Sequence, residues 1–241
     1  PVIGLRGVIR TLRLWKAEPV EPIDMPAFND QNYEKASREA VRAADMTALL
    51  YPGDSKRAGK TLRLRQQYLL CSATVQDLLR QCPQRERFAE QFAVQLNDTH
   101  PTMAVPELIR ILTSEGMDFE QAAEIAFRAF SFTNHTVMPE ALECWSESLM
   151  RAVAPELIPI IRRLDERLRA QGHEGLYIVE NHTIHMANLA VACTHCTNGV
   201  AELHTHILKE RVFADWHRAY PDRLQNVTNG ITPRRWLGVC N

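Results

Sequence analysis

Three short stretches of the sequence concentrate polar side chains of the kinds that bind sugars and phosphates. They are QLNDTHP, FTNHTVMPEALECW and VTNGITPRRW. The residues of interest in them are Asp98, His100, Asn134, His135, Glu140, Glu143, Asn229 and Trp236. Fixed donors and acceptors in this density suit a ligand that carries many hydroxyl groups. The three stretches therefore predict a polar pocket of the size of a sugar or a phosphate.

The first stretch directly follows a predicted strand. Residues 92–96, FAVQL, are mostly apolar and end in the polar run from Asn97 to His100. Open α/β sheets build their ligand sites where the strands end, so this position favours a binding role. Asp, Asn and Thr also cap helices, and for any single stretch that purely structural interpretation stays open.

The remaining elements are mostly helical by composition and pattern. A strand is predicted over 7–18, a helix over 32–50, turns over 51–60 and a second helix over 61–82. From residue 101 the pattern is helical almost to the end, with Pro-Glu pairs at 106, 139 and 155 as helix starts. Apolar residues over 155–170 fall on one stripe. Two or three strands among many helices predict a helix-rich α/β domain, and no domain boundary stands out.

Composition excludes several classes of protein. The 241 residues include 28 basic and 29 acidic residues, a net charge of −1, which argues against binding to nucleic acid or a membrane surface. No apolar run approaches the ~18 residues that span a bilayer. The chain starts PVIGLRG, without an initiator Met, and it ends abruptly at Asn241. We expect a piece of a longer protein.

Cys193 and Cys196 provide the sequence's one candidate metal motif. They are spaced as Cys-x-x-Cys and are followed by His204 and His206, so a zinc or redox module is an alternative function. Small apolar residues surround them, and the segment MANLAVACTHCTNGVAELH is predicted to form a helix with buried thiols. That pattern favours reduced cysteines without a metal. Arg234 and Arg235 lie beside Trp236 but lack the basic surroundings of a nucleic-acid site.

Several long polar segments of the sequence resemble those of one family, the α-glucan phosphorylases of glycogen, starch and maltodextrin. The matching runs, in family order, are LYPGD, GKTLRLRQQY, QLNDTHPTMAVPELIR, FTNHTVMPEALECW, MANLAV, NGVAELH and NVTNGITPRRWL. The resemblance implies transfer of a terminal α-1,4-glucosyl unit to phosphate, giving glucose 1-phosphate with retention. It also implies a fold of two Rossmann-like domains (GT-B type) and pyridoxal phosphate held as a Schiff base. Residues 1–241 would then be part of the N-terminal domain, ending near the boundary between the domains.

The resemblance also implies roles for individual residues. His135 and Asn229 match contacts to the glucosyl 6-hydroxyl and are the candidate catalytic residues. Asp98 and His100 match the pocket beside the reacting sugar, and Glu140 and Glu143 match acids on the same wall. Trp236 matches a residue near the coenzyme. A gating loop and helix are matched by Tyr51, Asp54 and Arg63.

Several departures limit what this chain is expected to do alone. No lysine in it occupies the family's Schiff-base motif, so the coenzyme domain is missing and the fragment is expected to be inactive by itself. Arg80 is followed by Gln81 rather than a second arginine, which argues against activation by a nucleotide. Helix 32–50 resembles the family's subunit-contact helix and implies a homodimer. A cytoplasmic location is expected. The alternative is a non-catalytic carbohydrate-binding or dimerisation unit.

Overall fold

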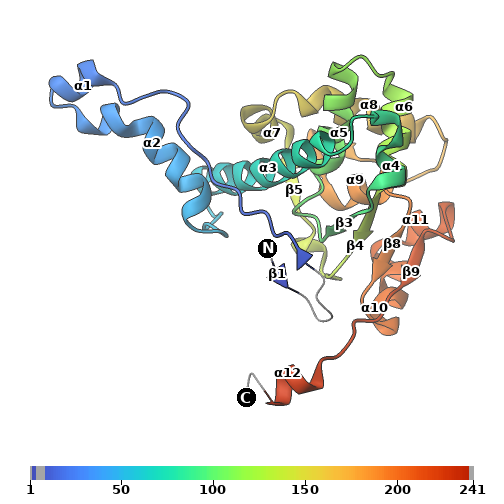
Figure 1. The fold of residues 1–241 in the computed structure, drawn as a ribbon. Coiled ribbons are helices and arrows are strands. Elements are labelled where there is room, and N and C mark those ends of the chain that lie inside the picture. The colour runs from blue at the N-terminus through green and yellow to red at the C-terminus, as the bar shows by residue number, and fades with distance from the viewer. Residues whose placement is uncertain (1, 4–8, 239–241) are drawn as a thin grey trace. The chain divides into compact units, whose positions relative to one another are not determined.

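The computed structural model describes residues 2, 3 and 9–238, and the chain divides into two compact units (Figure 1). The first unit is Pro1–Ala73 and the second is Thr74–Asn241. Gly7 and Val8, part of the strand predicted at the start, and Cys240 lie outside the described residues. In the part of the chain that the structure describes, no helix is both long enough and apolar enough to cross a membrane.

The first unit contains two helices, most of a third and a small antiparallel ladder. Its elements are β1 (Val2–Ile3), β2 (Ile9–Arg10), α1 (Met25–Asn29), α2 (Tyr33–Ala48) and the greater part of α3 (Arg57–Arg80). The predicted helix 32–50 is confirmed as α2, and the Asn32 side chain caps it by accepting from the Lys35 N–H at 3.2 Å. The strand expected over 7–18 is wrong beyond Arg10. Leu12 and Leu14 are 66% and 84% exposed, so no sheet formed by the described residues buries these two apolar positions.

Helix α3 confirms the helix predicted over 61–82 but starts four residues earlier, inside the segment predicted as turns. Gly59 lies in its first turn, where a Cβ would sit 1.7 Å from the carbonyl oxygen of Gly53. Only glycine allows that approach of the 51–54 loop to the helix. The helix passes through the boundary between the two units.

The second unit carries the remaining elements. They are η2 (Arg85–Arg87), α4 (Phe88–Gln91), β3 (Val94–Asn97), α5 (Ala104–Ser114), α6 (Phe119–Ala129), β4 (Phe130–Thr133), η3 (Pro139–Ala141), β5 (Cys144–Ser146), α7 (Glu147–Val153), α8 (Leu157–Arg169), β6 (Val179–Glu180), β7 (Thr183–His185), α9 (Met186–Ala192), β8 (Thr197–Gly199), α10 (Glu202–Ile207), the π-helix η4 (Leu208–Val212), α11 (Ala214–Ala219), β9 (Leu224–Asn226) and α12 (Pro233–Gly238).

A parallel four-stranded sheet in the order β3-β4-β8-β9 organises this unit. The predicted α/β class is confirmed, and so is the strand predicted over 92–96, as β3. The nearly all-helical prediction beyond residue 101 is wrong, because β4, β8 and β9 lie there, as does a separate antiparallel sheet in the order β5-β7-β6. Most of these strands have only two or three residues, which is too short for period-two alternation to be visible in the sequence.

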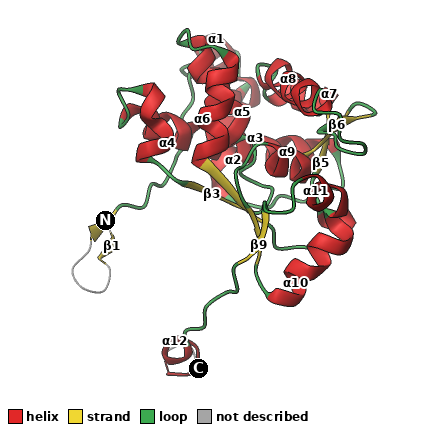
Figure 2. Cartoon of the chain, turned by 90° about the vertical axis from the view of Figure 1, so that its right-hand side faces the viewer, coloured by secondary structure: helices red, strands yellow, loops and turns green. Residues whose placement is uncertain are grey.

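Helices α5, α6 and α8 pack together beside the parallel sheet (Figures 1 and 2). The predicted amphipathic stripe is confirmed in α8, whose Leu157, Ile161, Leu164 and Leu168 are buried. The Pro-Glu pairs are less regular than expected: α5 starts two residues before Pro106, η3 starts at Pro139 and α8 starts two residues after Pro155. Proline is tolerated within a first turn because N–H groups there have no partner inside the helix.

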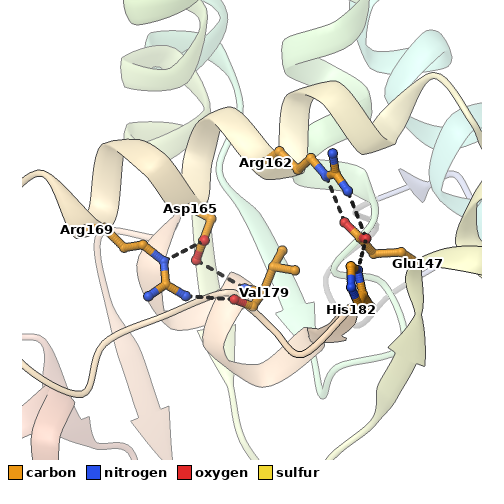
Figure 3. Close-up of polar contacts among 6 residues, drawn as sticks. All are labelled: Glu147, Arg162, Asp165, Arg169, Val179 and His182. Carbon is orange, nitrogen blue, oxygen red and sulfur yellow. Dashed lines mark hydrogen bonds and ion pairs between the residues drawn. The ribbon is translucent and has the colours of Figure 1, made fainter.

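Two carboxylates fasten α7 and α8 to the hairpin formed by β6 and β7 (Figure 3). Buried Glu147 accepts two hydrogen bonds from Arg162, at 2.8 and 2.9 Å, and lies 3.3 Å from His182 Nδ1. Asp165 accepts from the backbone N–H groups of Ile178 and Val179 at 2.6 and 3.1 Å. These contacts hold the hairpin against α8, and β7 leads directly into α9.

Candidate functional site

The candidate site lies where the four parallel strands end. Backbone hydrogen bonds continue between neighbouring segments of the chain just past the ends of the strands. The Asp98 N–H donates to the Thr133 carbonyl at 2.9 Å, and the Asn134 N–H donates to the Asn198 carbonyl at 3.0 Å. Parallel strands bring their carboxyl ends to one edge of the sheet, so residues 97–100, 133–136, 198–200 and 226–229 come together.

Asn97 and His135 follow neighbouring strands and contact each other. His135 Nε2 lies 2.5 Å from Asn97 Oδ1, the shortest side-chain contact at the site. An amide oxygen can only accept, so the proton of this hydrogen bond belongs to Nε2 and Nδ1 of a neutral ring is an acceptor. The contact fixes both the orientation and the tautomer of an exposed imidazole. His135, predicted as a catalytic residue, is thereby held in one position.

Asp98 adopts a backbone conformation that is uncommon for a residue with a side chain. Its φ is +66°, in the left-handed region, and its Oδ1 accepts from the Thr99 N–H at 2.8 Å. Such conformations cluster at ligand sites. Buried Thr99 then points its hydroxyl to Glu143 Oε2 at 3.4 Å. Thr99 thus hydrogen-bonds to both Asp98 and Glu143, two residues predicted to line one pocket.

A polar ladder crosses three strands at the same edge. Gln95 Nε2 donates to Thr133 Oγ1 at 2.7 Å, and the Thr133 hydroxyl donates to Asn198 Oδ1 at 2.8 Å. Asn198 is buried, and its amide N–H donates to the Gly199 carbonyl at 3.0 Å. A buried amide needs such partners, because a buried polar group left without them costs about 1–3 kcal/mol. The ladder fixes the relative positions of β3, β4 and β8.

His204 supports the loop that follows β8. Its Nδ1 accepts from the Val200 N–H at 3.1 Å, and the Val200 carbonyl accepts from the Asn229 N–H at 3.0 Å. Gly199 allows the approach, since a Cβ there would sit 2.4 Å from Thr205 Oγ1 and 2.9 Å from His204 Nδ1. His204 therefore acts through Val200 on the position of the Asn229 backbone.

Burial determines the charge of His204. It lowers the pKa of the imidazole below its ordinary 6.5, His135 adds to the shift and the Thr136 backbone opposes it. The neutral ring that results is the form in which Nδ1 can accept from Val200. Electrostatics and hydrogen-bond geometry agree on this state.

Asn229 presents a free side chain at the edge of the site. Its backbone N–H is held by Val200, whereas its exposed carboxamide makes no hydrogen bond to any residue that the structure describes. Asn134 is different, because it is fully buried and its Oδ1 accepts from the Thr136 N–H at 3.1 Å. Asn134 shapes the turn that follows β4, and Asn229 offers a donor and an acceptor to a ligand.

The other predicted residues are placed as follows. His100 is half-buried in the turn after β3, and Glu140 is exposed on η3. Trp236 is 51% exposed on α12, a helix without buried residues. Neither Glu140 nor Trp236 makes a described hydrogen bond to the strand-end side chains. The three gating residues belong to the first unit, where Arg63 Nη1 pairs with Asp54 Oδ2 at 3.0 Å and Tyr51 has a φ of +57°.

Sequence reasoning missed three residues of the site, namely Thr133, Asn198 and His204. Thr133 is the last residue of β4 and Asn198 is the middle residue of β8, two strands that were not predicted. The signal for Asn198 was present in the Asn-Gly pair at 198–199, which breaks the predicted helix 186–204. That helix prediction is confirmed over Met186–Ala192 and is wrong over 193–201, because Thr197–Gly199 forms the third strand of the sheet and a new helix starts at Glu202.

Cys193 and Cys196 do not lie at this edge of the sheet. They precede β8 and so lie near its opposite end. Cys193 is buried, and that burial raises the pKa of its thiol to about 12. Among the described residues there is no group of three or more His, Cys, Asp or Glu placed to hold a metal ion.

Fold and site together define an α/β protein with a polar ligand site at the carboxyl ends of a parallel sheet. The chain belongs to the carbohydrate phosphorylase family, whose model matches residues 1–241. The alpha-glucan phosphorylase H isozyme of Triticum aestivum is 43% identical over 256 residues, covering 96% of this chain and 31% of that protein. Alpha-glucan phosphorylase 2, cytosolic, of Arabidopsis thaliana is 41% identical, and the muscle form of glycogen phosphorylase of Homo sapiens is 40% identical; both matches cover 100% of this chain and 32% of the relative. The chain thus spans about a third of the length of these relatives.

Proposed function

We propose that this chain forms one wall of the active site of an α-glucan phosphorylase. The reaction is phosphorolysis of the terminal α-1,4-glucosyl unit of glycogen or a maltodextrin, giving α-D-glucose 1-phosphate with retention. The observation that carries the proposal is the arrangement at the strand ends, where polar side chains orient one another while the Asn229 carboxamide has no hydrogen-bond partner among the described residues. Family membership over the whole chain supports it.

In this proposal His135 and Asn229 bind the 6-hydroxyl of the reacting glucosyl unit. Asn97 orients the His135 ring, and the backbone carbonyl of His135 faces the positive charge that develops on the sugar. Asp98, His100 and Glu143 provide acceptors and donors beside that unit, and Glu140 extends the same wall. Binding that keeps the sugar in one orientation contributes to rate by removing its freedom of motion before reaction.

We propose that Tyr51, Asp54 and Arg63 belong to a loop and helix that gate the pocket. The described ion pair between Arg63 and Asp54 supports a loop that is fastened to the start of α3. Breaking this exposed pair would cost little, about 0–1 kcal/mol, which suits a segment that has to open and close.

Pyridoxal phosphate is implied by the family, but the residues of this chain do not fit a Schiff base. The five lysines are Lys16, Lys35, Lys56, Lys60 and Lys209. Four lie in the first unit, and Lys209 lies on η4, outside the polar contacts at the strand ends. We propose that the longer protein supplies the coenzyme lysine and the groups for substrate phosphate, and that Trp236 lies near the coenzyme. Residues 1–241 would be the later part of the N-terminal catalytic domain.

The assembly and location follow the same proposal. α2 exposes Tyr33 and Val41, which are 58% and 52% accessible, and this supports a homodimer formed through residues 32–50. The name of the Arabidopsis thaliana relative describes that protein as cytosolic, and we propose a cytoplasmic location here. The cysteines that the structure describes form no disulfide with one another, which agrees with a reducing compartment.

Phosphorolysis of maltoheptaose by the full-length protein, loaded with coenzyme, tests the proposal. We expect His135→Ala to lower kcat/KM about 100-fold, as loss of an oriented polar contact in a transition state does. The matched control is His195→Ala, an exposed histidine at the opposite end of β8, which should retain activity. A folded, coenzyme-loaded protein that is inactive on every glucan would contradict the enzymatic proposal. Maltoheptaose binding by that inactive protein would support a non-catalytic carbohydrate-binding unit instead.

A further inference from the structure

A cavity of about 150 Å³ lies in the second unit near the amino ends of the parallel strands, opposite the strand-end site. Its position follows from the topology. Phe127 lies on α6 just before β4, Cys193 follows α9 just before β8, and Arg223 immediately precedes β9; all three line the cavity. The cavity has no role in the proposed phosphorolysis.

Arg223 is the central feature of the cavity. Its guanidinium carbon lies 4.1 Å from the centroid of the Tyr220 ring and 4.8 Å from that of Phe127. Tyr220 is itself held by its hydroxyl, which contacts Gln171 Oε1. Two aromatic contacts therefore fix the guanidinium without using any of its N–H groups.

No described residue uses the hydrogen-bonding capacity of the Arg223 side chain. Its side chain makes no hydrogen bond or ion pair with any residue that the structure describes, although a guanidinium has five N–H donors. The side chain is half-buried, and this burial lowers the pKa of Arg223 from its ordinary value. A charge partly removed from water and lacking a counter-ion is unfavourable, and an oxyanion bound to the fork would relieve that cost.

The other groups that face the cavity define its electrostatics. Arg167 adds a second positive charge and also pairs with Glu120 at 3.3 Å. Glu124 is the one carboxylate among the lining residues, it is exposed, and it has no described partner. Cys193 is neutral, since its pKa is raised to about 12. The balance of the lining is thus positive.

The remaining walls are apolar and include Ile109, Leu164 and Leu168. A cavity of about 150 Å³ in another protein accommodates benzene, so the space suits a ligand with a single ring or a short branched chain. Inorganic phosphate would use the arginines but leave these walls without a contact.

We propose that this cavity binds a small amphiphilic carboxylate, with the carboxylate on the Arg223 fork and the apolar part between Phe127 and the leucines of α8. Benzoate is the probe. Its complex with the full chain is expected to have a Kd on the order of 1 mM, the range for a ligand of about nine heavy atoms. Benzamide, which has the same shape without the charge, should bind at least 10-fold more weakly. Phosphate should not displace benzoate at equal concentration.

Three cavity variants and one control variant, studied by calorimetric titration with benzoate, make the test specific. Arg223→Gln should weaken binding at least 10-fold, whereas the exposed control Arg211→Gln should bind as the parent does. Glu124→Gln should bind a few-fold more tightly, because it removes the carboxylate that competes for the arginines. Ala192→Leu fills the cavity while keeping Arg223, so it tests the proposal even if Arg223→Gln is poorly folded.

Four results would overturn the proposal. The first two are equal affinity for benzoate and benzamide, and displacement of benzoate by phosphate. The third is unchanged benzoate binding in both folded Arg223→Gln and folded Ala192→Leu. The fourth is no detectable binding to the folded parent at a benzoate concentration 20-fold above the expected Kd. The test does not involve glucans or coenzyme, so its outcome is independent of the proposed phosphorylase activity.

Discussion

His135 Nε2 lies 2.5 Å from Asn97 Oδ1, although 38 positions separate the two residues in the sequence. The contact exists because β3 and β4 are parallel neighbours in register, with Asn97 opposite Thr133. A histidine proposed to bind the reacting sugar is thus oriented by the end of the adjacent strand. Its geometry depends on the sheet rather than on its own loop.

The first prediction concerns this contact. Asn97→Ala should lower kcat/KM for maltoheptaose phosphorolysis by the full-length protein about 10-fold, because the His135 ring loses its orienting acceptor. Both side chains are exposed, so the melting temperature should barely change. Asn97→Asp keeps an acceptor and should retain more activity than Asn97→Ala. Equal activity of the two variants would show that the contact does not orient His135.

His204 provides the second prediction. His204→Leu removes the acceptor of the Val200 N–H, so amide hydrogen exchange at Val200 and Asn229 should accelerate about 10-fold or more, and stability should fall by about 1–3 kcal/mol. His204→Asn places an amide oxygen near the position of Nδ1 and should restore much of the protection. Exchange at Asn229 that is indifferent to both changes would exclude the positioning role.

The pH dependence of His204 follows from its lowered pKa. Between the folded and unfolded pKa values the unfolded chain binds more protons than the folded chain. The contribution of neutral His204 to stability is therefore fully present above the pKa of the unfolded state, about 6.5, and is lost as the pH falls below that value. Denaturant titrations should show that the free energy of unfolding of the parent falls between pH 7.5 and pH 5.5. The fall should be smaller in His204→Asn. A loss of the same size in both would assign the dependence to other groups.

Glu147 provides a prediction at lower pH. Hydrogen bonds from Arg162 lower the pKa of this carboxyl from 4.5 to about 2, with burial opposing and His182 assisting the shift. The contribution of Glu147 to stability is therefore present above pH 4.5 and is lost as the pH falls toward 2. Glu147→Gln should be less stable at pH 7 by about 2 kcal/mol, and this difference should shrink between pH 4.5 and 2. Exposed Glu166 on α8 is the control, and Glu166→Gln should change little.

The parts of the fold that sequence alone predicts are those with long local signals. α2 and α3 have helical composition over many residues, and α8 carries an apolar stripe with a period of 3.6. The Asn97–His100 run was recognised because β3 precedes it with an apolar segment. These predictions rest on neighbours in the chain and do not require knowledge of the tertiary structure.

The parts that escaped prediction depend on pairing between distant segments. β8 has three residues, Thr197, Asn198 and Gly199, and it becomes a strand only because β4 and β9 lie on either side of it. His204 looked like a possible zinc ligand, yet its Nδ1 is used by the Val200 N–H. Short-range patterns cannot report either fact, since tertiary contacts override local propensity.

The most direct test of the account is kcat/KM for maltoheptaose phosphorolysis by full-length Asn229→Ala, measured beside its melting temperature. The Asn229 carboxamide has no hydrogen-bond partner among the described residues, so its removal should leave stability unchanged. Loss of its hydrogen bond to the sugar should reduce kcat/KM about 10- to 100-fold. Unchanged kcat/KM in a protein of unchanged stability would contradict the claim that the strand ends bind the reacting glucosyl unit.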